Sequence, residues 1–214
     1  WTDPIVSNGI VFIGSGKGVV FALDAETGAE RWRFATDGVI PAGPVLIEGV
    51  IYFGSTVGRA IAVDAETGSA RWEFDAGRST PYPVLANGTL IWRCGGANIV
   101  RLDPETGAER WRLAIELAIE ASPIVVGGTL FVGSSDNHVY ALDAETGAES
   151  WRFRTSGRVV ASPASEYKTL YVASDQGHIY ALDHETGLEH WSFATDDRVI
   201  TSPVVAEGHV YVGG

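Results

Sequence analysis

The sequence is poor in the residues that form disulfides, metal clusters and basic surfaces. Its 214 residues include a single cysteine, Cys94, which excludes an intrachain disulfide and a cysteine-based metal cluster. Only Lys17 and Lys168 among the 15 basic residues are lysines, and the net charge is −12. Such an acidic surface disfavours nucleic acid, because that binding depends on Lys and Arg neutralising phosphates, and it disfavours anionic lipid.

Long apolar runs and metal-ligand spacings are also missing. No apolar run approaches the about 20 residues that a membrane-spanning helix needs, so no membrane insertion is predicted. The five histidines form no HExxH motif or comparable spacing, so no metal site is predicted. With 45% hydrophobic and 20% charged residues, the chain has the composition of a globular domain with a large core.

The strongest feature that is present is an internal repeat of about forty residues. The segment LDAETGAERW, which begins at residue 23, recurs four times along the chain. Its aspartates are Asp24, Asp64, Asp103, Asp143 and Asp183. A proline keeps the same phase, at Pro4, Pro44, Pro83, Pro123, Pro163 and Pro203.

Each repeat is expected to form four short strands, A to D, because β-branched and aromatic runs alternate with turn residues. In residues 123–153 these strands are predicted at 124–126, 130–133, 138–142 and 149–153. Residues 114–121 have helical propensity, but the repeat register places them in a D-to-A connection. We expect a loop there, with at most one helical turn.

Four strands per forty-residue repeat are the signature of a propeller blade, since blades that stack around an axis bury both sheet faces. The predicted fold is therefore an all-β β-propeller that forms a single domain over residues 1–214. The complete repeats are expected at 3–36, 43–76, 82–115, 122–155 and 162–195. A half repeat, with strands A and B alone, follows at 202–214.

The half repeat leaves ring closure open, because strands A and B are surplus to five complete blades. The chain is either a fragment of a longer array, which we favour, or an open ring, or it pairs with another chain through its unfinished edge. The start at Trp1 instead of Met agrees with a processed end or a fragment.

The pattern Ala-x-Asp-x-x-Thr-Gly-x-x-x-Trp runs from Ala22 to Trp32 and recurs in phase. It closely resembles the tryptophan-docking motif of PQQ-like (quinoprotein-type) β-propeller repeats; the third copy departs from it with Arg101 in place of Ala. That family contains pyrroloquinoline-quinone dehydrogenases, BamB-type outer-membrane assembly scaffolds and sensor domains of bacterial kinases. The resemblance favours the BamB-like non-enzymatic branch and an extracytoplasmic location, periplasmic or at the cell surface.

The motif residues are expected to have structural roles, because a copy in every repeat fits a blade seam better than a ligand site. The tryptophans that should dock between blades are Trp32, Trp72, Trp111, Trp151 and Trp191. The glycines that should leave room for them are Gly28, Gly68, Gly107, Gly147 and Gly187. The repeat aspartates should accept hydrogen bonds from their own tight turns, so no catalytic, cofactor-binding or metal residue is assigned.

The candidate binding residues are Arg78, Arg158, Arg198 and Tyr82. Each arginine lies five residues before a repeat proline and Tyr82 directly before one, in D-to-A connections, where propeller loops surround the mouth of the central channel. Converging arginines in an acidic protein suit an anionic ligand or an acidic peptide. The alternative is that they are solvated and pair with Glu116, Glu120, Asp196 or Asp197.

These observations favour a binding or scaffold propeller that contacts a protein partner, of unknown identity, through its loop faces. A PQQ-dependent alcohol or sugar dehydrogenase is the first alternative; the resemblance implies that it would need a calcium-held quinone, and many such enzymes a vicinal cysteine pair. One cysteine and short, uniform loops disfavour that cofactor, so none is predicted. A ligand-sensing domain of a larger signalling protein is the second alternative.

Overall fold

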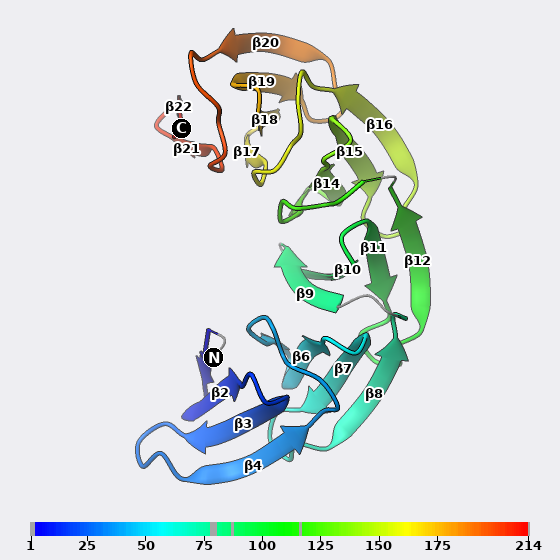
Figure 1. Ribbon diagram of the computed structural model, residues 1–214, viewed down its shortest axis with the longest axis vertical. Helices are drawn as coiled ribbons and strands as arrows, with labels where there is room; N and C mark the ends of the chain where they lie inside the picture. The colour runs from blue at the N-terminus through cyan, green and yellow to red at the C-terminus, as the bar shows by residue number, and fades with distance from the viewer. Residues whose placement is uncertain (1–2, 78–80, 87, 116, 214) are drawn as a thin grey trace. The chain divides into compact units, whose positions relative to one another are not determined.

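The computed structural model describes residues 3–77, 81–86, 88–115 and 117–213, and the regular elements of this part of the chain are all β-strands (Figure 1). Strands that follow one another in sequence form five four-stranded sheets and one two-stranded sheet. Among the described residues there is accordingly no helix that could span a membrane. The fold class is confirmed: each four-stranded sheet is one blade of a β-propeller.

The chain divides into two compact units. The first comprises Trp1–Leu85, Leu90–Gly95 and Ile99–Arg110, and the second comprises Ala86–Thr89, Gly96–Asn98 and Trp111–Gly214. The boundary falls within the third sheet, which contains β9 (Pro81–Ala86), β10 (Thr89–Cys94), β11 (Asn98–Leu102) and β12 (Glu109–Ala114). Each unit is described by itself below.

The first unit contains two whole sheets. The first sheet consists of β1 (Ile5–Ser7), β2 (Ile10–Gly14), β3 (Val19–Asp24) and β4 (Glu30–Ala35). The second consists of β5 (Val45–Ile47), β6 (Val50–Ser55), β7 (Arg59–Asp64) and β8 (Ala70–Asp75). All neighbouring strands within these sheets are antiparallel.

The second unit contains two whole sheets and a half sheet. The fourth sheet consists of β13 (Ile124–Val126), β14 (Thr129–Gly133), β15 (His138–Asp143) and β16 (Glu149–Arg154), which confirms the four strands predicted for this repeat. The fifth consists of β17 (Ala164–Glu166), β18 (Thr169–Ser174), β19 (His178–Asp183) and β20 (Glu189–Ala194). The half sheet pairs β21 (Val204–Ala206) with β22 (His209–Tyr211).

Tight turns set the register of each sheet. Gly127 and Gly128 join β13 to β14, and both have a positive φ, at 56° and 83°. A two-residue hairpin of this type requires φ > 0 at both positions, and glycine adopts it without steric cost. The turn therefore pairs Ile124 with Phe131, and alternate side chains of the strands point to opposite faces of the sheet.

The core lies between successive sheets. In the first unit, Phe12 and Val20 of the first sheet pack with Phe53 and Ile61 of the second, and all four are buried. In the second unit, Phe131 and Val139 meet Leu170 and other side chains of the fifth sheet in the same way. Because each sheet buries its faces only against its neighbours, stacking rather than any single blade supplies the apolar burial.

A threonine after strand D ties the loops of one face together. The Thr155 hydroxyl lies 3.0 Å from the carbonyl oxygen of Asn137 and 2.6 Å from that of Gly157. Thr36 and Thr195 make the equivalent contacts in their own repeats. The B-to-C and D-to-A loops of a blade are thus held side by side, as the propeller prediction required.

Candidate binding site

The repeat aspartates close their own turns. Asp24 Oδ1 accepts hydrogen bonds from the backbone N–H of Glu26 and Thr27 and from the Thr27 hydroxyl, at 3.2, 3.0 and 2.9 Å. Asp24 Oδ2 accepts one from Arg31 Nη2 at 2.6 Å. The equivalent Oδ1 contacts surround Asp64, Asp103, Asp143 and Asp183. These carboxylates are therefore engaged within their own turns.

The motif tryptophan of one repeat lies on the turn glycine of the next. Trp72 Nε1 donates to the carbonyl oxygen of Pro104 at 2.9 Å, and a Cβ on Gly107 would lie 2.6 Å from Cδ2 of that indole. Within their own units, three further pairs have the same arrangement: Trp32 on Gly68, Trp111 on Gly147 and Trp151 on Gly187. Glycine is required beneath each indole because a side chain would occupy the space of the ring.

The turn aspartates predict a loss of stability in acid. The Arg71 hydrogen bond, and then the N–H of Thr67, lower the pKa of Asp64 to about 2, whereas an unfolded aspartate titrates near 3.9. A depressed folded-state pKa stabilises the fold above the unfolded value, and that contribution is lost as the pH falls through the folded value. We expect the guanidinium concentration at the denaturation midpoint to decrease as the pH is lowered from about 4 to about 2.

The matched control is Asp64→Asn, which lacks the titrating group but keeps an oxygen that can accept the turn hydrogen bonds. Its midpoint should depend less on pH in that window than the midpoint of the parent protein. Identical pH profiles for the two proteins would contradict the assignment.

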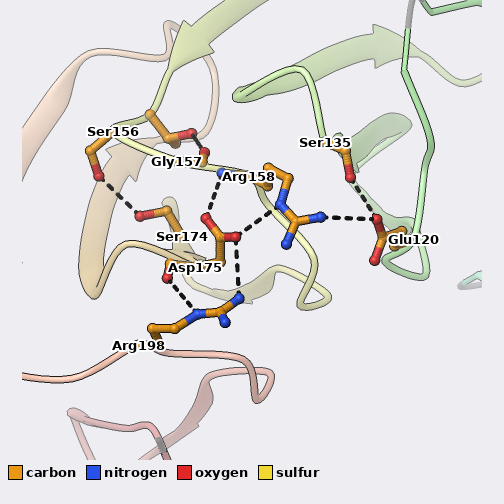
Figure 2. A network of polar contacts seen from close by, with 9 residues as sticks. Glu120, Ser135, Ser156, Gly157, Arg158, Ser174, Asp175 and Arg198 are labelled. Atoms are coloured by element: carbon orange, nitrogen blue, oxygen red, sulfur yellow. Dashed lines mark hydrogen bonds and ion pairs between the residues drawn. The ribbon is translucent and has the colours of Figure 1, made fainter.

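The structure brings two of the four candidate binding residues together. Arg158 and Arg198, from successive D-to-A loops, both contact Asp175 in the B-to-C loop after β18 (Figure 2). Tyr82 lies within β9 of the first unit and not in the connection predicted for it, and its ring is 5.3 Å from the guanidinium carbon of Arg93. Arg78 lies outside the described residues.

Asp175 is the centre of this arginine cluster, which we define as Arg158, Asp175 and Arg198. The side chain of Asp175 is only 4% exposed. Its Oδ1 accepts the backbone N–H of Arg158 at 2.9 Å, and its Oδ2 accepts Arg158 Nε at 2.9 Å. Arg198 Nη2 lies 3.5 Å from the same Oδ2, and Arg198 Nε donates to the Asp175 carbonyl oxygen at 3.3 Å. One buried carboxylate thus orients both guanidinium groups.

The outer side of the cluster is open. The Arg158 and Arg198 side chains are 48% and 65% exposed. Glu120, one of the predicted partners, lies 3.8 Å from Arg158 Nη1 and also accepts a hydrogen bond from the Ser135 hydroxyl at 2.8 Å. The described residues offer no partner to Arg158 Nη2 or to Arg198 Nη1. These groups can donate to a ligand that approaches from solvent.

A row of serines runs beside the cluster. The backbone N–H of Ser122 donates to the hydroxyl oxygen of Ser162 at 3.0 Å, and that of Ser162 donates to Ser202 at 3.0 Å. These serines precede successive repeat prolines, so they are one repeat apart. The hydrogen bonds fix the starts of consecutive A strands, and with them the spacing of the loops that carry the arginines.

Sequence reasoning missed Asp175 and Ser135 as members of the site. Both are at the same repeat position, directly after a serine at the end of or just beyond strand B, where Thr56 stands in the second repeat. In each case this residue donates its backbone N–H to the D-to-A loop of the preceding repeat: Thr56 to Val39, Ser135 to Ala118 and Asp175 to Arg158. That shared repeat position is the signal that could have found them.

The described carboxylates and the single cysteine bear on whether the chain could hold a calcium-bound quinone. Among the described residues, no group of three or more His, Cys, Asp or Glu side chains lies close enough to hold a metal ion. The single cysteine, Cys94, is buried within a blade seam of the first unit. The turn aspartates are already engaged by threonine and, in the first three repeats, by arginine.

The blades, the seam tryptophans and the Asp–Thr–Gly turns define a β-propeller built from PQQ-like repeats. A family model described as "Outer membrane protein assembly factor BamB" matches residues 2–97, 58–167 and 156–214. Because these matches cover nearly the whole chain, it belongs to this BamB-type family of PQQ-like repeats, as its motif predicted. The curated proteins contained no significant match.

Solved structures share the fold at low identity. BamB from Moraxella catarrhalis has a TM-score of 0.75 and is 23% identical, over 94% of this chain and 66% of that one. Quinohemoprotein alcohol dehydrogenase from Comamonas testosteroni has a TM-score of 0.72 and is 20% identical, over 90% of this chain and 42% of that one. The computationally designed Ika8 protein has a TM-score of 0.78 and is 18% identical, over 99% of this chain and 67% of that one. At such identities the likeness shows the fold alone.

Proposed function

We propose that this chain is a non-catalytic scaffold that binds a protein partner through the loop face carrying Arg158 and Arg198. The observation that carries the proposal is the arginine cluster. A carboxylate that is 4% exposed orients two exposed guanidinium groups, and their remaining donors face solvent. Such preorganisation lowers the entropy cost of binding, because the donors are already placed.

The partner that this chemistry suits is a protein segment that carries carboxylates. A guanidinium forms paired hydrogen bonds with a carboxylate, and these are stronger than neutral ones. The chain as a whole, with a net charge of −12, repels such a segment. The cluster is therefore the place at which an acidic partner would dock, and the surrounding charge would fix its orientation.

The family supports a role in protein assembly outside the cytoplasm. The matching family is described as an outer membrane protein assembly factor. One of the similar solved structures is BamB itself. This supports our proposal that the chain acts in the periplasm or at the cell surface. The chain spans 66% of the Moraxella protein, so that protein's own role is carried here as a proposal.

The competing function is that of a quinoprotein dehydrogenase, because the Comamonas alcohol dehydrogenase shares the fold. Incubation of the chain with pyrroloquinoline quinone and Ca²⁺, followed by gel filtration and a dye-linked alcohol oxidation assay, separates the two functions. We expect the quinone absorbance to elute apart from the protein and no dye to be reduced. Retained quinone together with turnover would overturn the scaffold proposal.

The binding arm of the test uses a fluorescein-labelled peptide of repeated Glu-Val pairs and its Gln-Val counterpart. We expect the chain to bind the Glu peptide, to bind it less as salt rises, and to bind the Gln peptide at least about tenfold more weakly. Arg158→Ala and Arg198→Ala should each weaken binding of the Glu peptide by about tenfold. Arg33→Ala, which removes an exposed arginine of the first unit, should leave binding unchanged.

Equal binding of the two peptides, or equal affinity of all three variants, would contradict a role for the arginine cluster in recognition.

A further inference from the structure

One motif tryptophan has no turn beneath it. Trp32, Trp72, Trp111 and Trp151 each lie on a turn glycine of the following repeat, whereas no described glycine would bring a Cβ onto Trp191. Trp191 is 43% exposed, while Trp72, at the same repeat position, is 8% exposed. No acceptor for the Trp191 Nε1–H lies in the part of the chain that the structure describes. A side chain built for a blade seam is thus displayed to solvent.

This tryptophan lines an apolar groove of about 640 Å³ within the second unit. One wall is the outer face of the fifth sheet, with Tyr171 and Phe193 beside Trp191. The other wall is β22 and the residues after it, Val210 and Val212 among them. Phe193 is exposed here, whereas its counterpart Phe153 is half-buried against Tyr180 of the next blade at a ring distance of 5.2 Å.

The second wall also carries unpaired backbone. In the fifth sheet, strand B (β18) pairs with β17 on one side and with strand C (β19) on the other. In the half sheet, the equivalent strand β22 pairs with β21, and no described strand lies on its other side. A free strand edge beside an apolar face is the arrangement that accepts an added strand.

We propose that this groove binds a further C–D hairpin of the same repeat type: an apolar strand, an Asp-x-x-Thr-Gly turn and a second strand. The first strand would extend the sheet beyond β22. By the register of β18 with β19, its Ala and Leu positions would face Tyr211 and Val210. Trp191 would rest on the turn glycine and donate its Nε1–H to the carbonyl that follows the aspartate, as Trp151 donates to His184.

The half sheet leaves room in the groove for a two-stranded hairpin but not for a whole blade. β21 and β22 already occupy the positions that strands A and B take in a complete repeat. The first repeat of a second copy, which also has a turn glycine with nothing within 4 Å at Gly28, brings its own A and B strands. Those strands would overlap β21 and β22, whereas a two-stranded segment fits the groove without displacing them.

The test adds an unlabelled peptide, with the sequence of residues 177–195, to the ¹⁵N-labelled chain and follows its indole N–H signals. We expect the Trp191 signal to shift and its solvent exchange to slow, while the signals of Trp72 and Trp151 stay unchanged. A peptide with Gly187→Val should bind at least about tenfold more weakly, because the added side chain occupies the indole site. Trp191→Ala in the chain should weaken binding by a similar factor.

A second form of the test attaches the hairpin to the chain and so avoids the folding cost of a free hairpin, which is marginally stable in water. Residues 175–195 are appended directly after Gly214, so that the half repeat continues in register. The extended chain should have a higher Tm than the parent, and Trp191 should be protected from exchange. An unchanged Tm with a fully exchanging Trp191 would overturn the proposal, as would a parent chain that dimerises in sedimentation and protects Trp191 without any added hairpin.

Discussion

Gly107→Ala is expected to lower the free energy of unfolding by about 2 to 5 kcal/mol. The residue has φ +73°, where an alanine costs about 1 to 2 kcal/mol. Its Cβ would also lie 2.6 Å from Cδ2 and 2.7 Å from Cε3 of Trp72, which real contacts do not allow. The ring is buried between Tyr52 and Trp92, so relief requires the blades to shift, and overpacking adds about 1 to 3 kcal/mol.

Gly28→Ala is the matched control for this prediction. Gly28 has nearly the same φ, +71°, in the same turn, but a Cβ there meets nothing within 4 Å. Its replacement should cost only the backbone term of about 1 to 2 kcal/mol. Guanidinium denaturation of both variants measures the difference. Equal costs would show that the glycine serves the turn alone and does not make room for the indole.

Trp72→Ala is expected to cost about 3 to 5 kcal/mol, the range for removing a buried tryptophan. The indole is 8% exposed, contacts Trp92 with ring centres 6.1 Å apart, and donates to Pro104 at 2.9 Å. Its removal leaves a cavity at the seam between the second and third sheets, and the Pro104 carbonyl keeps only the Tyr52 hydroxyl, at 3.2 Å, of its two donors. Both effects act on the interface that stabilises the two blades together.

Trp191→Ala supplies the comparison, because it removes the same side chain from the same position of a repeat. Since Trp191 is 43% exposed and has no turn beneath it, the cost should be about 1 kcal/mol or less. Denaturation midpoints of the two variants, followed by circular dichroism, give the two costs. A loss at Trp191 as large as that at Trp72 would contradict the seam role assigned to the motif.

The sequence predicted the fold well because the repeat determines it. The four strands of residues 123–153 lie where alternating apolar residues and glycine turns placed them, to within a residue or two. The seam position of Trp72 likewise agrees with the predicted docking role, whereas Trp191, which was also expected to dock, is 43% exposed. Because the motif recurs in every repeat, local propensity and long-range packing give the same answer wherever a following repeat is described.

The arginine cluster could be predicted only in part. The repeat phase places Arg158 and Arg198 in successive loops, but their shared partner Asp175 lies 17 and 23 residues away along the chain. The acids predicted from the sequence as partners lie in D-to-A connections; one of them, Glu120, does lie 3.8 Å from Arg158. The choice of Asp175 depends on the hydrogen bond between one repeat's D-to-A loop and the next repeat's B-to-C loop, which no single repeat contains.

The account depends on one claim: each blade is stable because it stacks on its neighbours, with an indole enclosed at each seam. The most direct measurement is solvent exchange of the indole N–H groups in the ¹⁵N-labelled native chain. The account predicts strong protection of Trp32, Trp72, Trp111 and Trp151, whose donors are bound to carbonyls of the following repeat, and rapid exchange of Trp191. Exchange of those four indoles at the rate of Trp191 would contradict it.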